Sequence, residues 1–124
     1  MINLSEAAIE LDEIVSFLKR NIQFKDVYEK ILQQRVINQA AQERGLSVTP
    51  EEIQIEANRM RYEKRLEKAS ETMAWLADQM ITPEEWEGGI RDRLLSKKLA
   101  ESLFAKEVEK FFAQNRLNFD QVLL

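Results

Sequence analysis

The fold is decided by a stretch that occurs twice along the chain, first as Val48-Thr49-Pro50-Glu51-Glu52-Ile53 and again as Ile81-Thr82-Pro83-Glu84-Glu85-Trp86. In each copy the Thr can cap a helix, the Pro suits a first helical turn, and the second Glu can return a hydrogen bond to the Thr. The apolar residues at the two ends of each copy are placed to form a hydrophobic staple. The sequence therefore predicts two helices, one starting at Pro50 and the other at Pro83.

Helical patterns also dominate the rest of the chain. Residues 12–20 have acids at their start and bases at their end, which the helix dipole favours. Residues 24–44 carry apolar side chains around most of their circumference, so we expect a central helix that neighbours contact on several sides, closed by Gly45 in a left-handed cap. The predicted fold is all-α, a compact bundle of five to six helices. The expected helices cover 12–20, 24–44, 50–68, 71–80, a long segment from 83 onwards, and a last segment that ends near 115.

A glycine pair, Gly88-Gly89, lies near the start of the long predicted helix. Each Gly should weaken that turn by about 1 kcal/mol relative to Ala. Close approach of another backbone is one reason to tolerate this cost.

The end of the chain has a different pattern. Residues 116–124 alternate apolar and polar side chains before three apolar residues, which is typical of the beginning of a strand. No other segment offers a strand partner, and a lone strand cannot satisfy its backbone. We therefore expect a helical domain over residues 1–115 and a strand-like tail over 116–124 that leads toward a missing domain. Pairing of the tail with another chain is the alternative.

Composition excludes several classes of function. With 124 residues the chain has room for one domain, and it contains neither His nor Cys. The common zinc, haem and iron–sulfur sites and the Ser–His and Cys–His catalytic pairs are therefore excluded. The acidic pairs Glu51/Glu52 and Glu84/Glu85 are accounted for by capping and dipole chemistry. We expect no cofactor, no metal site and no catalytic residue in this chain.

The amino terminus and the net charge suggest a location and exclude some partners. The first residues lack a basic start and a continuous apolar stretch, which excludes a signal peptide and a membrane span there. We expect a cytoplasmic protein with no membrane partner. A net charge of −4 argues against nucleic acid as a partner.

The order of these signals resembles a known family. A broad apolar helix ends in the run 37–45, and Leu46-Ser47-Val48-Thr49-Pro50-Glu51-Glu52-Ile53 follows it. After a variable helix come Met80-Ile81-Thr82-Pro83-Glu84-Glu85-Trp86 and Ile90-Arg91-Asp92-Arg93-Leu94-Leu95. From about Asp12 to Phe112 the chain resembles the N-terminal domain of SurA-type chaperones and related parvulin-type peptidyl-prolyl isomerases. The resemblance implies a helical module that holds unfolded or extended polypeptide, in a protein whose isomerase domain lies outside this chain.

The peptide binding that the resemblance implies requires an apolar surface that a peptide can reach. Flexible thioethers and broad aromatic rings adapt to varied peptides, although the same residues can fill a core. Tyr62 with Leu66, on the second apolar line of the third helix, is the preferred groove. The first line is Ile53, Ala57 and Met60. The candidate peptide-binding residues are Met60, Tyr62, Leu66, Met73, Trp75 and Met80.

Two other interpretations stay open at this point. The basic residues of the third helix could contact nucleic acid, but interleaved Glu63 and Glu67 favour a solvated helix face. A non-catalytic structural or adaptor domain that acts through self-association, as a homodimer, or through a protein partner is the alternative to peptide binding. Whether the whole protein is an enzyme also stays open. The basic residues in question are Arg59, Arg61, Lys64, Arg65 and Lys68.

Overall fold

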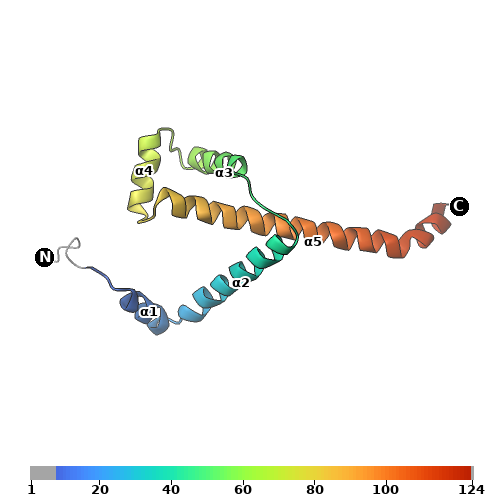
Figure 1. Ribbon diagram of the computed structural model, residues 1–124, viewed down its shortest axis with the longest axis horizontal. Coiled ribbons are helices and arrows are strands. Elements are labelled where there is room, and N and C mark those ends of the chain that lie inside the picture. The colour runs from blue at the N-terminus through green and yellow to red at the C-terminus, as the bar shows by residue number, and fades with distance from the viewer. Residues whose placement is uncertain (1–7, 124) are drawn as a thin grey trace. The chain divides into compact units, whose positions relative to one another are not determined.

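A computed structural model describes residues 8–123, and side chains are described for residues 8–114. Residues 8–123 form five helices and no strand, which confirms the all-α class (Figure 1). The chain divides into two units, residues 1–36 and residues 37–124. The first unit holds α1 and the start of α2, and the second holds the end of α2 with the three later helices. The helices are α1 (Leu11–Arg20), α2 (Phe24–Glu43), α3 (Pro50–Glu63), α4 (Ala69–Asp78) and α5 (Pro83–Leu123).

Both predicted helix starts are confirmed by their hydrogen bonds. At α3 the amide of Glu52 donates to Thr49 Oγ1 over 3.1 Å, and the amide of Thr49 donates to the Glu52 carboxylate over 3.1 Å. At α5 the amide of Glu85 donates to Thr82 Oγ1 over 3.1 Å, and that of Thr82 to the Glu85 carboxylate over 3.0 Å. Each capping box satisfies amides that would otherwise have no partner in the helix, so both starts are fixed by local chemistry.

The end of α2 is as predicted, but α3 ends five residues before the expected Lys68. Gly45 has a φ of +67° after α2, as a left-handed cap requires. After α3 the left-handed position is Arg65, with a φ of +58°. The amide of Leu66 then donates to the carbonyl of Arg61 over 2.8 Å and closes the turn. No Gly occupies the left-handed position of this turn, so its place could not be predicted from the sequence.

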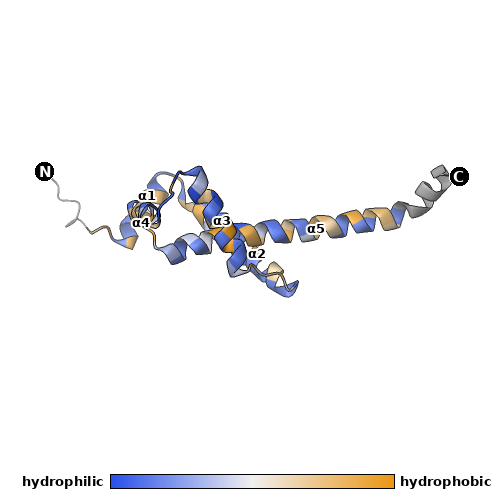
Figure 2. Ribbon diagram, turned by 90° about the horizontal axis from the view of Figure 1, so that it is seen from above, coloured by the Kyte–Doolittle hydropathy of each residue, from blue (hydrophilic) through white to orange (hydrophobic). Residues whose placement is uncertain are grey.

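The core of the second unit lies between α3 and α5, which pack against each other (Figure 1). Ile53 and Ala57 of α3 and Ile90 of α5 are buried together. Apolar and hydrophilic segments alternate along α5, as a helix with one packed face requires (Figure 2). Four half-buried side chains surround the buried cluster: Val48, Met60, Trp86 and Leu94.

The short helix α4 contacts α5 through an aromatic pair. Leu76 and Thr72 are the buried residues of α4. Trp75 meets Trp86 of α5 edge to face, with ring centroids 6.0 Å apart, a favoured geometry for aromatic rings. The ring of Trp75 also lies 4.9 Å from the ammonium of Lys64. One tryptophan thus joins the end of α3, α4 and the start of α5.

The long helix α5 corrects two expectations. It is continuous from Pro83 to Leu123, so no separate last helix ends near residue 115. Residues 116–123 are helical rather than strand-like, and Leu124 lies outside the described residues. A helix satisfies its backbone internally, whereas a lone strand would leave its polar groups unpaired. Among the described residues no other backbone lies within 4 Å of a Cβ built on Gly88 or Gly89, so a close backbone approach does not account for this glycine pair.

The described part of the first unit has no buried residue. All of α1 is exposed or half-buried, and the only buried residue of α2 is Ala41, in the second unit. Within the first unit, α2 is therefore not the central helix, contacted on several sides, that the sequence predicts. The apolar residues of its first half, such as Val27 and Ile31, are exposed. None of the helices in residues 8–123 is both long enough and apolar enough to cross a bilayer.

Candidate functional site

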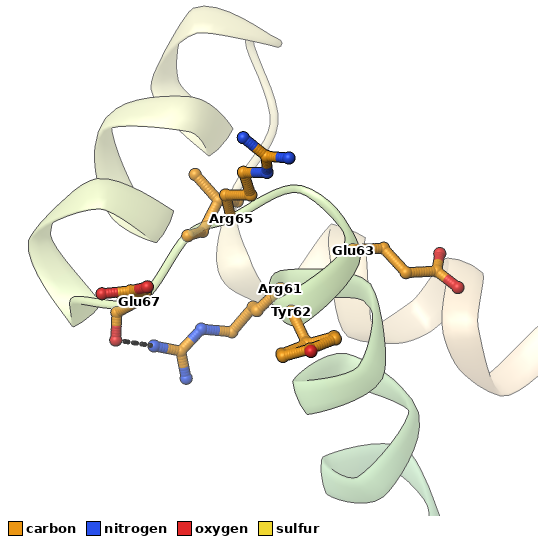
Figure 3. Close-up of a pocket in the computed structure, with 6 residues that line it drawn as sticks. Arg61, Tyr62, Glu63, Arg65 and Glu67 are labelled. Atoms are coloured by element: carbon orange, nitrogen blue, oxygen red, sulfur yellow. Dashed lines mark hydrogen bonds between the residues drawn. The ribbon is translucent and has the colours of Figure 1, made fainter.

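A surface hollow of about 420 Å³ lies at the turn between α3 and α4 (Figure 3). It exists because α3 stops at Glu63 and the chain reverses through the left-handed Arg65 instead of continuing as a helix. The side chains of the last turn of α3 are therefore left without a following turn to cover them. The hollow is lined by Arg61, Tyr62, Glu63, Arg65, Leu66 and Glu67.

The apolar part of the hollow comes from two residues four positions apart. Tyr62 is 86% exposed, and Leu66 is half-buried. Ile55, two helical turns before Tyr62 on the same face of α3, is 70% exposed. The first apolar line of α3 packs on α5, and this second line stays open to solvent.

The polar rim offers donors and acceptors. Arg61 Nη2 donates to the carbonyl of Glu67 over 3.4 Å, and its Nε is buried without a hydrogen-bond partner among the described residues. The amide of Glu67 donates to the Glu71 carboxylate over 3.0 Å, and this bond fixes the backbone of Glu67 in the lining of the hollow. The side chain of Arg65 makes no hydrogen bond or ion pair within residues 8–114, and it points away from Arg61 (Figure 3). An apolar floor with free donors at its edge suits a peptide, which brings both side chains and carbonyls.

The six predicted binding residues do not form one surface. Only Tyr62 and Leu66 line the hollow. Met60 packs against the core, with its sulfur 3.6 Å from Arg93 Nη2, and Trp75 lies half-buried on Trp86. Both therefore have packing roles in the structure.

Two further predicted residues are open to solvent. Met80 is 88% exposed at a left-handed position, and Met73 is half exposed on α4. Neither lines the hollow. They remain candidates for a wider binding surface on the second unit.

Sequence reasoning did not assign the charged lining of the hollow to a site. Arg61 and Arg65 stood out as part of a basic helix face, and Glu63 and Glu67 as its acidic partners. Because α3 was expected to continue to Lys68, the turn that gathers these four residues could not be seen. A helix of that length would have placed the two arginines on one face and the two glutamates on the opposite face.

The remaining cations of the basic cluster are largely engaged within the chain. Arg59 donates to Glu56 through Nε over 3.0 Å and also pairs with Glu63. The hydrogen bond and charge of Glu56 raise the pKa of Arg59, and the same hydrogen bond lowers the pKa of Glu56. Lys64 lies over the ring of Trp75. These cations are paired with groups of the chain, which supports the solvated helix face over a phosphate-binding surface.

A second hollow, of about 300 Å³, lies between the start of α3 and α5. Its apolar lining includes Ile53 and Ala57, which belong to the buried cluster. Its rim carries Glu87 and Arg91. Because its apolar side chains are already packed in the core, it offers a peptide less free apolar surface than the hollow at Tyr62.

Neither metal chemistry nor known relatives point to another site. No group of three or more acidic side chains is placed to hold a metal ion within the part of the chain that the structure describes. Comparison with protein-family models, with curated proteins and with solved structures finds no match to this chain.

Proposed function

We propose that this chain is a peptide-binding, chaperone-like module that holds unfolded or extended polypeptide at the turn between α3 and α4. The observation that carries the proposal is the exposed ring of Tyr62 beside Leu66 in a hollow whose rim holds an unpaired Arg65. Exposed apolar side chains in a hollow are a feature of surfaces that bind other chains.

The chemistry of the hollow favours loose binding of many sequences. An apolar side chain of the client would cover the Tyr62 ring and Leu66, which removes apolar area from water. The guanidinium of Arg65 would donate a hydrogen bond to a client carbonyl and so take the place of the water that hydrates this carbonyl. Met73 and Met80 would extend the contact, because thioethers adapt to different shapes. Such contacts select extended apolar segments rather than one sequence.

The proposal also concerns the whole protein. The resemblance to SurA-type N-terminal domains supports a module that works beside a parvulin-type prolyl isomerase domain. In this proposal the chain itself has the helical bundle of SurA-type N-terminal domains. No His or Cys is present in the chain, so the isomerase chemistry would belong to that other domain. The proposed location is the cytoplasm.

The test is binding of a fluorescein-labelled, uncharged peptide rich in Leu, Phe and Ser, measured by fluorescence anisotropy. We expect Tyr62→Ser to weaken binding about ten-fold, since the variant removes the area that one buried ring contributes. Aggregation of an unfolded model protein should be suppressed by the natural chain and less by the variant. Binding should survive added salt, because its main contribution is apolar.

A matched control distinguishes peptide binding in the hollow from nonspecific binding to exposed aromatic side chains. Phe104 is an exposed aromatic residue of α5 that does not line the hollow, so Phe104→Ser should leave peptide affinity unchanged. Equal losses in both variants would argue against the hollow as the site. No peptide binding and no suppression of aggregation by the natural chain would reject the proposed function.

A further inference from the structure

The first unit carries an apolar helix face that nothing described covers. Leu11, Ile14, Val15 and Leu18 recur at spacings of three, four and seven residues, which places them on one face of α1. None of the four is buried, and Leu11 is 73% exposed. An uncovered apolar face of this kind on a short helix is unstable in water without a partner.

The charges of α1 are arranged asymmetrically around this face. Asp12 and Lys19 are seven residues apart, two helical turns, and border the apolar face on the same edge. Glu13 and Arg20 are also seven residues apart, but they lie on the opposite side of the helix. Within residues 8–36 the ion pairs lie within α2, between Lys25 and Glu29 and between Asp26 and Lys30.

The charges of α1 therefore have no ion-pair partner in the described part of the first unit. The ammonium of Lys19 lies 5.0 Å from the centre of the Phe24 ring, at the edge of the apolar face. The edge thus presents an acid near the start of α1 and a base near its end, both free to pair with another helix.

The balance of charge decides what kind of partner fits. Residues 8–36 contain five acidic and five basic side chains, so this segment has no net charge. An anionic lipid surface or a nucleic acid would favour an excess of Lys and Arg. A partner with the same acid-to-base order, running in the opposite direction, complements α1 at every charged position on the edge.

We propose that the partner of α1 is α1 of a second copy of this chain, packed antiparallel about a two-fold axis. Such an axis brings the same edge of both helices together, with Asp12 of each copy opposite Lys19 of the other. The two apolar faces then cover each other, and two equivalent ion pairs flank them. This interface is independent of the hollow at Tyr62, so the proposal does not depend on peptide binding.

The test uses the full chain in sedimentation equilibrium over a wide range of concentration. The natural chain should form dimers whose fraction rises with concentration. Asp12→Lys alone, and Lys19→Asp alone, should each raise the dimer dissociation constant about ten-fold, because two attractions become two repulsions. An equimolar mixture of the two variants should recover the natural affinity, since each heterodimer restores opposite charges at both positions.

Two back-face variants with the same changes of charge serve as controls. Glu13→Lys and Arg20→Asp should leave the dissociation constant unchanged, because these residues lie opposite the proposed interface. Circular dichroism of all variants would check that helix content is retained. A natural chain that stays monomeric at every concentration would overturn the proposal, as would a mixture that associates no better than its separate components. Binding of the monomer to phosphatidylserine vesicles through α1, without dimers, would overturn it in favour of a lipid partner.

Discussion

The ammonium of Lys98 lies 2.7 Å from the carboxylate of Glu52, and it also donates to the carbonyl of Ser47 over 2.8 Å. One cation of α5 thereby holds both the start of α3 and the loop before it. The hydrogen bond from Lys98, followed by that from the amide of Thr49, lowers the pKa of Glu52 below its ordinary value of 4.5. The capping residue of α3 is therefore also its main ionic link to α5.

This link predicts a dependence of stability on pH. Because the folded pKa of Glu52 is lowered, its contribution is fully present above the unfolded value of 4.5 and is lost as the pH falls through the folded pKa. In an NMR titration, Lys98→Met should raise the pKa of Glu52 toward 4.5. The variant should also show a smaller loss of stability on acidification than the natural chain. An unchanged Glu52 pKa in the variant would mean that the Thr49 amide alone sets it.

The buried cluster predicts unequal costs for the same substitution at two isoleucines. Ile90 is 0% exposed, so Ile90→Ala should lower the free energy of unfolding by about 3 kcal/mol through lost burial and a cavity. Ile55 lies on the open line of α3, so Ile55→Ala should change it by less than about 0.5 kcal/mol. Urea unfolding followed by circular dichroism measures both. Similar costs at the two positions would place the core elsewhere than between α3 and α5.

Two glycines predict effects of opposite sign. Gly88 lies inside α5 with open space around a built Cβ, so Gly88→Ala should stabilise the protein by about 1 kcal/mol. Gly45 has a left-handed φ, so Gly45→Ala should destabilise it by about 1 kcal/mol. Thermal unfolding of both variants checks the signs. A destabilised Gly88→Ala variant would show that a neighbour approaches α5 at this turn.

The helix starts could be predicted because capping is a local interaction. Thr49 and Glu52, like Thr82 and Glu85, are three residues apart, and their reciprocal hydrogen bonds need nothing from the rest of the chain. Gly45 could be predicted as a cap for the same reason. The end of α3 could not, because an Arg takes the left-handed position there and Arg carries no sequence signal for it.

The candidate site was predicted only in part, because burial depends on which face of a helix meets a neighbour. The split of α3 into two apolar lines follows from spacing, and the structure shows that α5 covers the line of Ile53 and leaves Tyr62 open. Met60 and Trp75 are as adaptable as Met80, yet contacts distant in sequence place them in packed surroundings. Amino-acid type alone could not separate the three.

The packing of α3 on α5 also has a consequence for the chain while it is being synthesised. A ribosome releases α3 before α5, so Ile53 and Ala57 stay in contact with water until Ile90 has left the exit tunnel. The first unit, which has no buried residue among positions 8–36, is released earlier still. The nascent chain therefore exposes the apolar face of α3 to water until α5 has emerged, and the core between the two helices cannot form before then.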